Sequence, residues 1–161
     1  MTERVLYIPF DHLNSSYGVM VTADKKKDLI VLVESKRMIS SPKWHKERLF
    51  FLISSARHFA KELQDKGFQV KYLKAETTVI GLQDVSKGKP VYCAQPSSFK
   101  QTEQLADFGV NFVPNDFFLT PRDFFLDWAK QQKTFVMENF YRKQRQRLGI
   151  LVSNGEPEGG Q

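Results

Sequence analysis

The stretch DLIVLVES (28–35), followed after a short break by WHKERLFFLISSARHFAKEL (44–63), decides the fold. Its first part contains an unbroken apolar run, which is typical of a strand covered on both faces, as in a parallel sheet. Its second part carries apolar residues at helical spacing, and Gly67 follows as a helix-ending residue. Together they predict a buried strand that leads through a loop, KRMISSPK (36–43), into a long helix.

The chain up to about residue 113 alternates further strands and helices joined by short links. Strands are predicted at 4–10, 68–73, 91–94 and 110–113, and helices at 77–85 and 99–108. The apolar and polar alternation of 68–73 indicates a strand nearer the edge of the sheet. This succession predicts an α/β domain with a three-layer Rossmann-like open sheet, its strands mostly parallel and its helices on both faces. Flavodoxin-like and Rossmann-like strand orders both stay open.

The last third of the chain changes character. Two helices are predicted, at 122–130 and at about 136–148, and the second is crowded with arginines and a lysine in its C-terminal half. The tail, 155–161, is polar and rich in glycine, as linkers are. We therefore expect an α/β domain over residues 1–150 and the start of an interdomain linker over 151–161.

Composition limits the class of protein. The chain has 161 residues, the size of one domain, and the N-terminus lacks the pattern of a signal peptide. Its one cysteine, Cys93, lies in an apolar strand, which predicts a buried thiol, no internal disulfide and a reducing, cytoplasmic setting. The net charge of +6 is compatible with binding to nucleic acid, or it serves solubility alone.

Motifs for common catalytic sites are absent from the sequence. It contains neither GxGxxG nor GxxxxGK[ST], and no GxSxG, which disfavours a standard dinucleotide, P-loop or hydrolase site. The three histidines, His12, His45 and His58, do not have the spacing of metal ligands. A small α/β enzyme acting on nucleotides or sugars is therefore the least favoured function.

Polar residues follow several predicted strands at their carboxyl ends, where parallel sheets bind ligands. The expected rim of a pocket there consists of Phe10, Asp11, His12, Glu34, Gln95, Ser97 and Ser98. Such donors and acceptors could orient a flat heterocycle while apolar residues cover it. The alternative is that Asp11 and Glu34 only cap loops or pair with lysines. His45, near the start of the long helix, points either into this pocket or to the surface.

Four segments together resemble one family. They are VLYIPFDHLN (5–14), LIVLVES (29–35), HKERLFFLISSARHFAKELQDKGFQVKY (45–72) and FVMENFYRKQRQRLGILVSNGEPEGGQ (135–161). They resemble the N-terminal domain of the deoxyribodipyrimidine photolyase-related proteins, the iron–sulfur bacterial cryptochromes and (6-4) photolyases of the cryptochrome/photolyase superfamily. The last segment is the most specific.

The resemblance implies an antenna domain that holds a light-harvesting chromophore, commonly 6,7-dimethyl-8-ribityllumazine, and passes excitation to FAD. It also implies that FAD, the iron–sulfur cluster and the DNA-lesion site belong to a helical C-terminal domain beyond this chain. That FAD-binding domain is then the expected partner, and DNA is reached through it. The implied role is DNA photorepair by a lyase or blue-light sensing, with the chain alone not catalytic.

Carried over residue by residue, the resemblance implies a chromophore site in this sequence. Its expected residues are Phe10, Asp11, His12, Glu34, His45, Leu52, Gln95 and Ser97. Asp11, Leu13, Glu34 and the His45–Lys46 pair match the family pattern. Phe10 and His12 replace a glycine and a glutamine, and Gln95 and Ser97 lie where the family carries carboxylates. These departures leave an alternative, a chromophore-free module that docks on a catalytic partner through 117–128.

Overall fold

A computed structural model describes residues 2–40, 44–154 and 156–159. The chain forms two compact units, Met1–Phe117 and Phe118–Gln161, and each is described by itself. None of the helices within the described residues is long and apolar enough to cross a membrane. The expected division at residue 150 stays a prediction.

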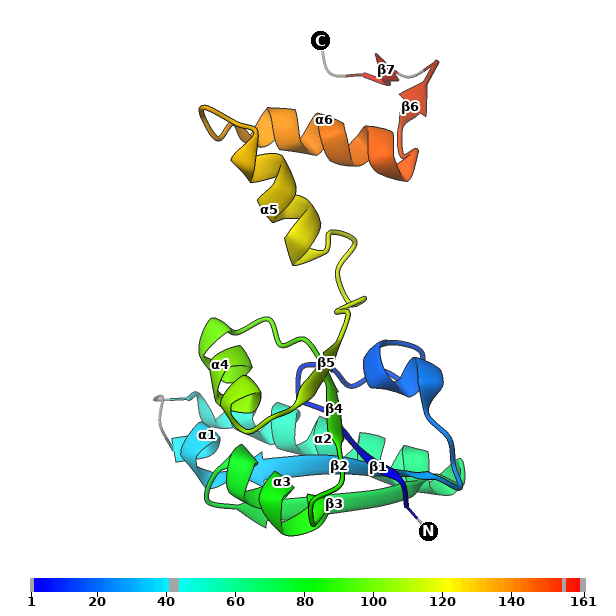
Figure 1. Cartoon of the computed structure of the whole chain (residues 1–161), viewed down its shortest axis with the longest axis vertical. Helices are drawn as coiled ribbons and strands as arrows, with labels where there is room; N and C mark the ends of the chain where they lie inside the picture. Colours follow the sequence, from blue (N-terminus) through cyan, green and yellow to red (C-terminus); the bar gives the residue numbers. More distant parts are fainter. Residues whose placement is uncertain (1, 41–43, 155, 160–161) are drawn as a thin grey trace. The chain divides into compact units, whose positions relative to one another are not determined.

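The first unit is built on a five-stranded sheet with all strand pairs parallel (Figure 1). Its strands are β1 (Arg4–Tyr7), β2 (Asp28–Ser35), β3 (Gln69–Ala75), β4 (Val91–Ala94) and β5 (Asn111–Val113). Their order, β3-β2-β1-β4-β5, is the Rossmann order. It decides between the Rossmann-like and flavodoxin-like strand orders that the sequence left open. The predicted fold class is confirmed, and β3 is the predicted edge strand.

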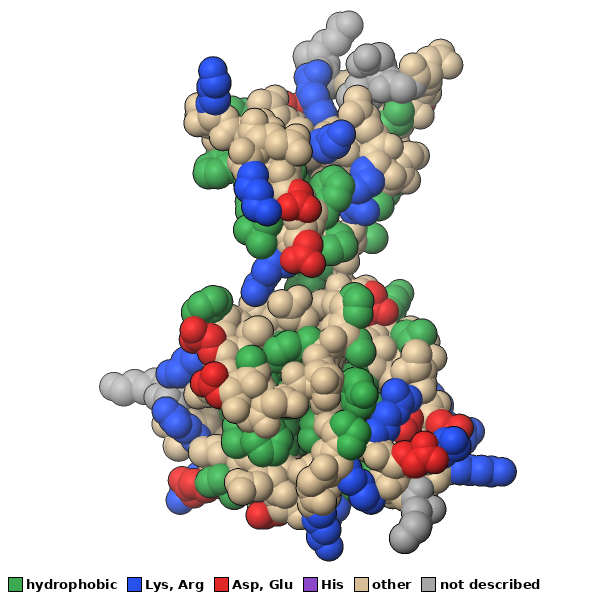
Figure 2. Space-filling model, viewed as in Figure 1, with side chains coloured by type: hydrophobic (Ala, Val, Ile, Leu, Met, Phe, Trp, Pro, Cys, Tyr) green, Lys and Arg blue, Asp and Glu red, His purple; other side chains and the backbone are tan. Residues whose placement is uncertain are grey.

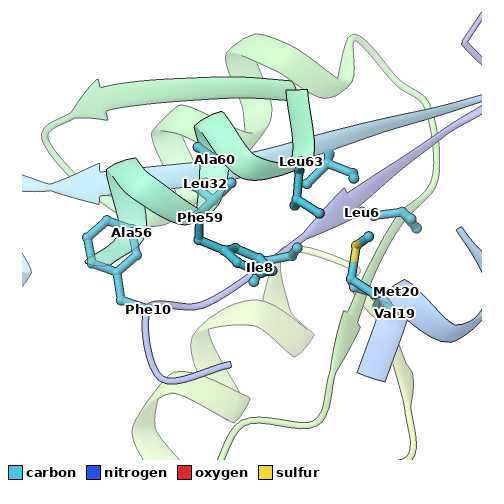
Figure 3. Close-up of a cluster of buried hydrophobic side chains, with 11 residues drawn as sticks. Leu6, Ile8, Phe10, Val19, Met20, Leu32, Ala56, Phe59, Ala60 and Leu63 are labelled. Atoms are coloured by element: carbon cyan, nitrogen blue, oxygen red, sulfur yellow. The ribbon is translucent and has the colours of Figure 1, made fainter. Parts of the chain in front are cut away.

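Alternation along the strands produces two apolar layers. Leu6, Ile8, Ile30 and Leu32 pack against α2 (Lys46–Asp65) and the 3₁₀ helix η1 (Gly18–Thr22), as Figure 3 shows for most of this cluster. Their neighbours in sequence belong to a second buried cluster, with α3 (Thr78–Ser86) and α4 (Phe99–Asp107). This cluster consists of Val5, Tyr7, Val31, Val33, Leu82, Val85, Val91, Cys93, Leu105 and Val110. Both faces of the inner strands are therefore covered, as the unbroken apolar run predicted.

The helix boundaries follow from local chemistry. His45 caps α2 by accepting a hydrogen bond from the backbone N–H of Glu47, and Gly67 beyond its other end has the positive φ of +87° that glycine adopts readily. A short helix, α1 (Lys36–Ser40), forms where a loop was expected. Ser35, at the end of β2, starts it by accepting a hydrogen bond from Met38 N–H, as an N-cap does.

The second unit contains α5 (Arg122–Lys130), α6 (Met137–Leu148) and a hairpin of two-residue strands, β6 (Val152–Ser153) and β7 (Glu156–Pro157). The two helices meet through aromatic rings, with Phe140 lying 4.7 Å from Trp128 and 5.2 Å from Phe125 between ring centroids. The predicted helices are confirmed to within a residue. The hairpin is an addition, since the sequence indicated only a linker there.

Candidate functional site

Glu34 lies at the carboxyl end of β2 on the side of α2, with its side chain buried. Its carboxylate accepts hydrogen bonds of 2.7 Å from both Arg57 Nη2 and the Tyr72 hydroxyl, and Lys74 Nζ lies 3.8 Å away. Phe10 joins the group because its ring stacks on that of Tyr72, 6.2 Å between centroids. The structure thus brings together two of the predicted site residues.

Electrostatics show that this carboxylate is already satisfied. Burial alone acts to raise the pKa of Glu34, but the hydrogen bonds from Tyr72 and Arg57 outweigh it, so the pKa is lowered. Burial and the neighbouring carboxylate raise the pKa of Tyr72 to about 12. Glu34 pairs with basic side chains, as the alternative interpretation of the sequence held, although Arg57 is closer than Lys74.

His12 lies on the other side of β1, where the strand order reverses between β1 and β4. It is buried, its ring stacks on Phe117, and neither ring nitrogen has a hydrogen-bond partner among the described residues. Burial lowers the pKa of His12, opposed by the charges of Asp11 and Asp116. The remaining space beside Ala94 and Gly18 is only about 10 Å³, the room of about one water.

The other predicted residues are spread over the unit. Asp11 and Ser97 are exposed, and His45 is largely exposed as the cap of α2. Gln95 is half-buried, and its backbone carbonyl accepts a hydrogen bond from Asn115 Nδ2 at 2.7 Å. Leu52 is half-buried on α2. Contact of these residues with a chromophore stays a prediction.

A larger cleft opens at the same edge of the sheet, on the side of α3 and α4. Its volume is about 570 Å³, and it is bounded by α1, by Trp44 just before α2, by the N-terminal end of α3 and by α4 along its length. Figure 2 shows hydrophobic side chains in the middle of the face that carries α3 and α4, with charged ones around it. The lining residues are Ser35, Arg37, Met38, Trp44, Thr77, Thr78, Val79, Ser98, Lys100, Gln101, Gln104, Leu105 and Asp107.

The walls of this cleft combine apolar surface with hydroxyl and amide groups. Trp44 is fixed against α1 because its indole N–H donates to the Met38 carbonyl at 3.0 Å. Beneath the cleft, the buried Tyr7 hydroxyl interacts with Thr78 and Gln101, and burial raises the pKa of Tyr7. Sequence reasoning placed only Ser98 in this pocket. The available signal was the pair of N-cap residues, Thr77 and Ser98, which lie two and four residues after the ends of β3 and β4.

The described residues offer no other site of clear chemistry. No group of three His, Cys, Asp or Glu side chains among them could hold a metal ion. Cys93 is buried as predicted, and burial raises the pKa of its thiol, which keeps it protonated and unreactive.

Comparison with known proteins agrees with this architecture. The family model described as "Deoxyribodipyrimidine photo-lyase-related protein" matches residues 6–161. A (6-4) photolyase from Agrobacterium fabrum (strain C58 / ATCC 33970) is 28% identical over 176 residues, covering 99% of this chain. The chain spans 34% of the length of that relative. Since the family model matches nearly the whole sequence, the chain belongs to the family of deoxyribodipyrimidine photolyase-related proteins.

Proposed function

We propose that this chain is the light-harvesting domain of a photolyase- or cryptochrome-related protein. It binds a flat chromophore, a ribityllumazine, in the cleft between α1, α3 and α4. When bound, the chromophore absorbs light and passes the excitation to FAD in a separate catalytic domain, for DNA photorepair or blue-light sensing. The chain itself performs no chemistry. The observation that carries the proposal is the cleft of about 570 Å³ at the carboxyl edge of a Rossmann-ordered sheet.

The residues of the cleft fit such a chromophore. Its volume lies within the roughly 300–1,000 Å³ of small-molecule sites. Trp44 and Met38 offer a flat apolar wall for the ring system, while Gln101 and Gln104 can donate to and accept from ring and ribityl groups. The space beside His12 at the strand-order reversal is too small for a heterocycle. We therefore place the chromophore on the α3 and α4 side rather than beside His12.

Titration with 6,7-dimethyl-8-ribityllumazine tests the proposal, with anisotropy of the lumazine fluorescence as the signal. We expect binding to the unmodified chain and a loss of about tenfold in Trp44→Ala, because an aromatic pair is worth about 0.5–1.5 kcal/mol beyond the area it buries, and about 1.4 kcal/mol is a factor of ten. Phe51→Ala is the control, since Phe51 is an exposed aromatic residue on α2 outside the lining of the cleft. Glu34→Gln tests the predicted site on the α2 side and should leave the affinity unchanged.

Two results would count against the proposal. Binding no tighter than roughly millimolar, ~4 kcal/mol, removes the antenna role for this chain. Tight binding that is lost in Glu34→Gln or Phe10→Ala, but not in Trp44→Ala, keeps the function and moves the chromophore to the α2 side.

A second candidate function is a chromophore-free module that docks on the FAD-binding domain. The observation that favours it is the large apolar surface of the second unit, where Leu119, Phe135 and Met137 are 71%, 70% and 80% exposed. Figure 2 shows hydrophobic side chains on the surface of this unit. Sedimentation of the chain with the FAD-binding domain of a family member, without chromophore, tests it. Association that Leu119→Glu weakens supports docking, and two separate sedimenting species count against it.

A further inference from the structure

Two helix N-termini, which carry free hydrogen-bond donors, line the cleft. The helices α3 and α4, each of nine residues, begin there at the N-caps Thr77 and Ser98. The first backbone N–H groups of a helix have no partner within it, and the helix dipole adds partial positive charge. The same cavity is also lined by two basic side chains, Arg37 and Lys100. The helix termini and these cations together determine which ligand groups the cavity can bind.

Three of the four hydroxyl side chains that line the cleft already accept a hydrogen bond. Ser35 Oγ accepts from Met38 N–H at 3.3 Å, Thr77 Oγ1 from Ile80 N–H at 3.2 Å, and Ser98 Oγ from Gln101 N–H at 3.4 Å. Each hydroxyl keeps its own O–H proton for donation. A ligand group that only accepts hydrogen bonds therefore matches these three side chains best.

The charges of the lining point the same way. Arg37 and Lys100 both line the cleft, and the side chains of the described residues give neither of them an ion pair. Glu76, whose backbone carbonyl accepts a hydrogen bond from Arg37 N–H at 3.0 Å, pairs through its side chain with Lys36 at 3.2 Å instead. The one acidic lining residue, Asp107, ends α4, about 13 Å along the helix from Ser98 at ~1.5 Å per residue.

From these donors we infer that the cleft recognises a phosphomonoester on the tail of its chromophore, with the phosphate between Arg37 and Lys100 and the ring system against Trp44. A phosphomonoester is an anion with acceptor oxygens only, so it complements cations, hydroxyl protons and helix N–H groups together. The inference rests on the proposed function and deepens it, since it specifies the class of chromophore: one with a phosphorylated polyol tail.

Two ligands that differ only in the phosphate give the direct test. We expect the 5′-phosphate of 6,7-dimethyl-8-ribityllumazine to bind about tenfold or more tighter than the unphosphorylated lumazine at low salt, and this preference to shrink as salt is raised. The double variant Arg37→Gln/Lys100→Gln should lose the preference, so that the ratio of its affinities for the two lumazines falls to about one. Lys89→Gln, a lysine in an exposed turn away from the cleft, is the control.

A second measurement separates this inference from the proposed function. Inorganic phosphate alone should raise the melting temperature relative to chloride at equal ionic strength, and less so in the double variant. Equal affinity for the two lumazines overturns the inference and leaves the antenna function standing. If neither lumazine binds but phosphate stabilises through Arg37 and Lys100, the antenna function fails and the phosphate site remains. A phosphate response that the double variant keeps overturns the site.

Discussion

The ring of His12 lies against the ring of Phe117, with centroids 4.5 Å apart and planes 16° from parallel. This pair closes the space between the carboxyl ends of β1 and β4, where open α/β sheets commonly hold their ligands. The protein thus fills that position with its own side chains. The larger room for a ligand at this edge, about 570 Å³, lies on the side of α3 and α4, and a smaller space of about 440 Å³ lies beside Glu34.

The stacked His12 predicts a loss of stability in mild acid. Because burial lowers its pKa in the folded protein, the unfolded chain binds the proton more readily, starting near pH 6.5. His12 thus favours folding fully above that pH, and its contribution falls as the pH drops toward the lowered folded pKa. One proton limits the slope to about 1.4 kcal/mol per pH unit. Urea unfolding at pH 7.5 and 5.5 should show this decrease.

His12→Phe is the diagnostic variant, because it keeps an aromatic ring against Phe117 and removes the titrating group. We expect its free energy of unfolding to change less between the two pH values than that of the unmodified protein. His58, exposed on α2, provides the control His58→Gln, which should keep the full pH dependence. The same slope in His12→Phe as in the unmodified protein would show that another group is responsible.

The environment of Glu34 predicts a second loss of stability, at more acidic pH. The pKa of Glu34 is lowered in the folded protein, since the hydrogen bonds from Tyr72 and Arg57 outweigh burial. Its contribution to the free energy of unfolding is therefore complete above its unfolded pKa near 4.5. This contribution disappears as the pH falls through the folded pKa. Glu34→Gln should cost about 1–3 kcal/mol at neutral pH and make the decline in acid less steep. Tyr72→Phe, which removes one of the two short bonds, should cost less. Chemical unfolding at pH 7 and pH 4 measures both.

Gly81 predicts a steric effect inside α3. A Cβ atom there would lie 2.8 Å from Val33 Cγ1, closer than real Cβ contacts, and 3.1 Å from Ala75 Cβ, which is tighter than most of them. Gly81→Ala gains about 1 kcal/mol in helix propensity but loses about 1–3 kcal/mol through overpacking, so we expect net destabilisation. In a double-mutant cycle, Val33→Ala should relieve the clash and give a favourable coupling energy. Strictly additive effects would refute this packing argument.

Most of the first unit could be predicted from the sequence because its signals are local. The apolar run before Glu34 indicated a strand covered on both faces, and Gly67 and Gly109 end their helices with positive φ. The alternation of 68–73 placed β3 at the edge. The short helix α1 was missed because a single serine, Ser35, starts it with a cap, and a stretch of five residues carries no periodicity.

The candidate cleft could not be predicted because its residues come from four separate elements. Its walls depend on which face of the sheet each connecting helix covers. A strand that is apolar on both faces does not reveal which helix lies on which face. The sequence placed Phe10 and Glu34 at the correct edge, but it did not show that Arg57 and Tyr72 satisfy the carboxylate. Nor did it show that Phe117, far along the chain from His12, fills the space beside that ring.

The last prediction concerns Arg145, within the stretch that carries the strongest resemblance to the family. Its guanidinium is buried, lies 5.5 Å from the ring centre of Tyr141, and donates to the backbone carbonyls of Ile150, Leu151 and Glu158, the last at 2.8 Å. One side chain therefore holds the chain that follows α6 against that helix. Arg145→Met keeps the length of the side chain and removes these donors, so we expect the segment after Leu148 to become sensitive to protease.

Limited chymotrypsin digestion with mass spectrometry measures this effect, since Leu148 and Leu151 are cleavage sites. Arg142→Met is the matched control: Arg142 pairs with Glu138 at 2.8 Å on an exposed face, where such an i,i+4 pair is worth only about 0.3–0.5 kcal/mol. Digestion of Arg145→Met at the rate of the control would mean that the hairpin is held by its own strand pairing. If only Arg145→Met is digested faster, the hydrogen bonds from the guanidinium to the three backbone carbonyls are what keep this segment ordered.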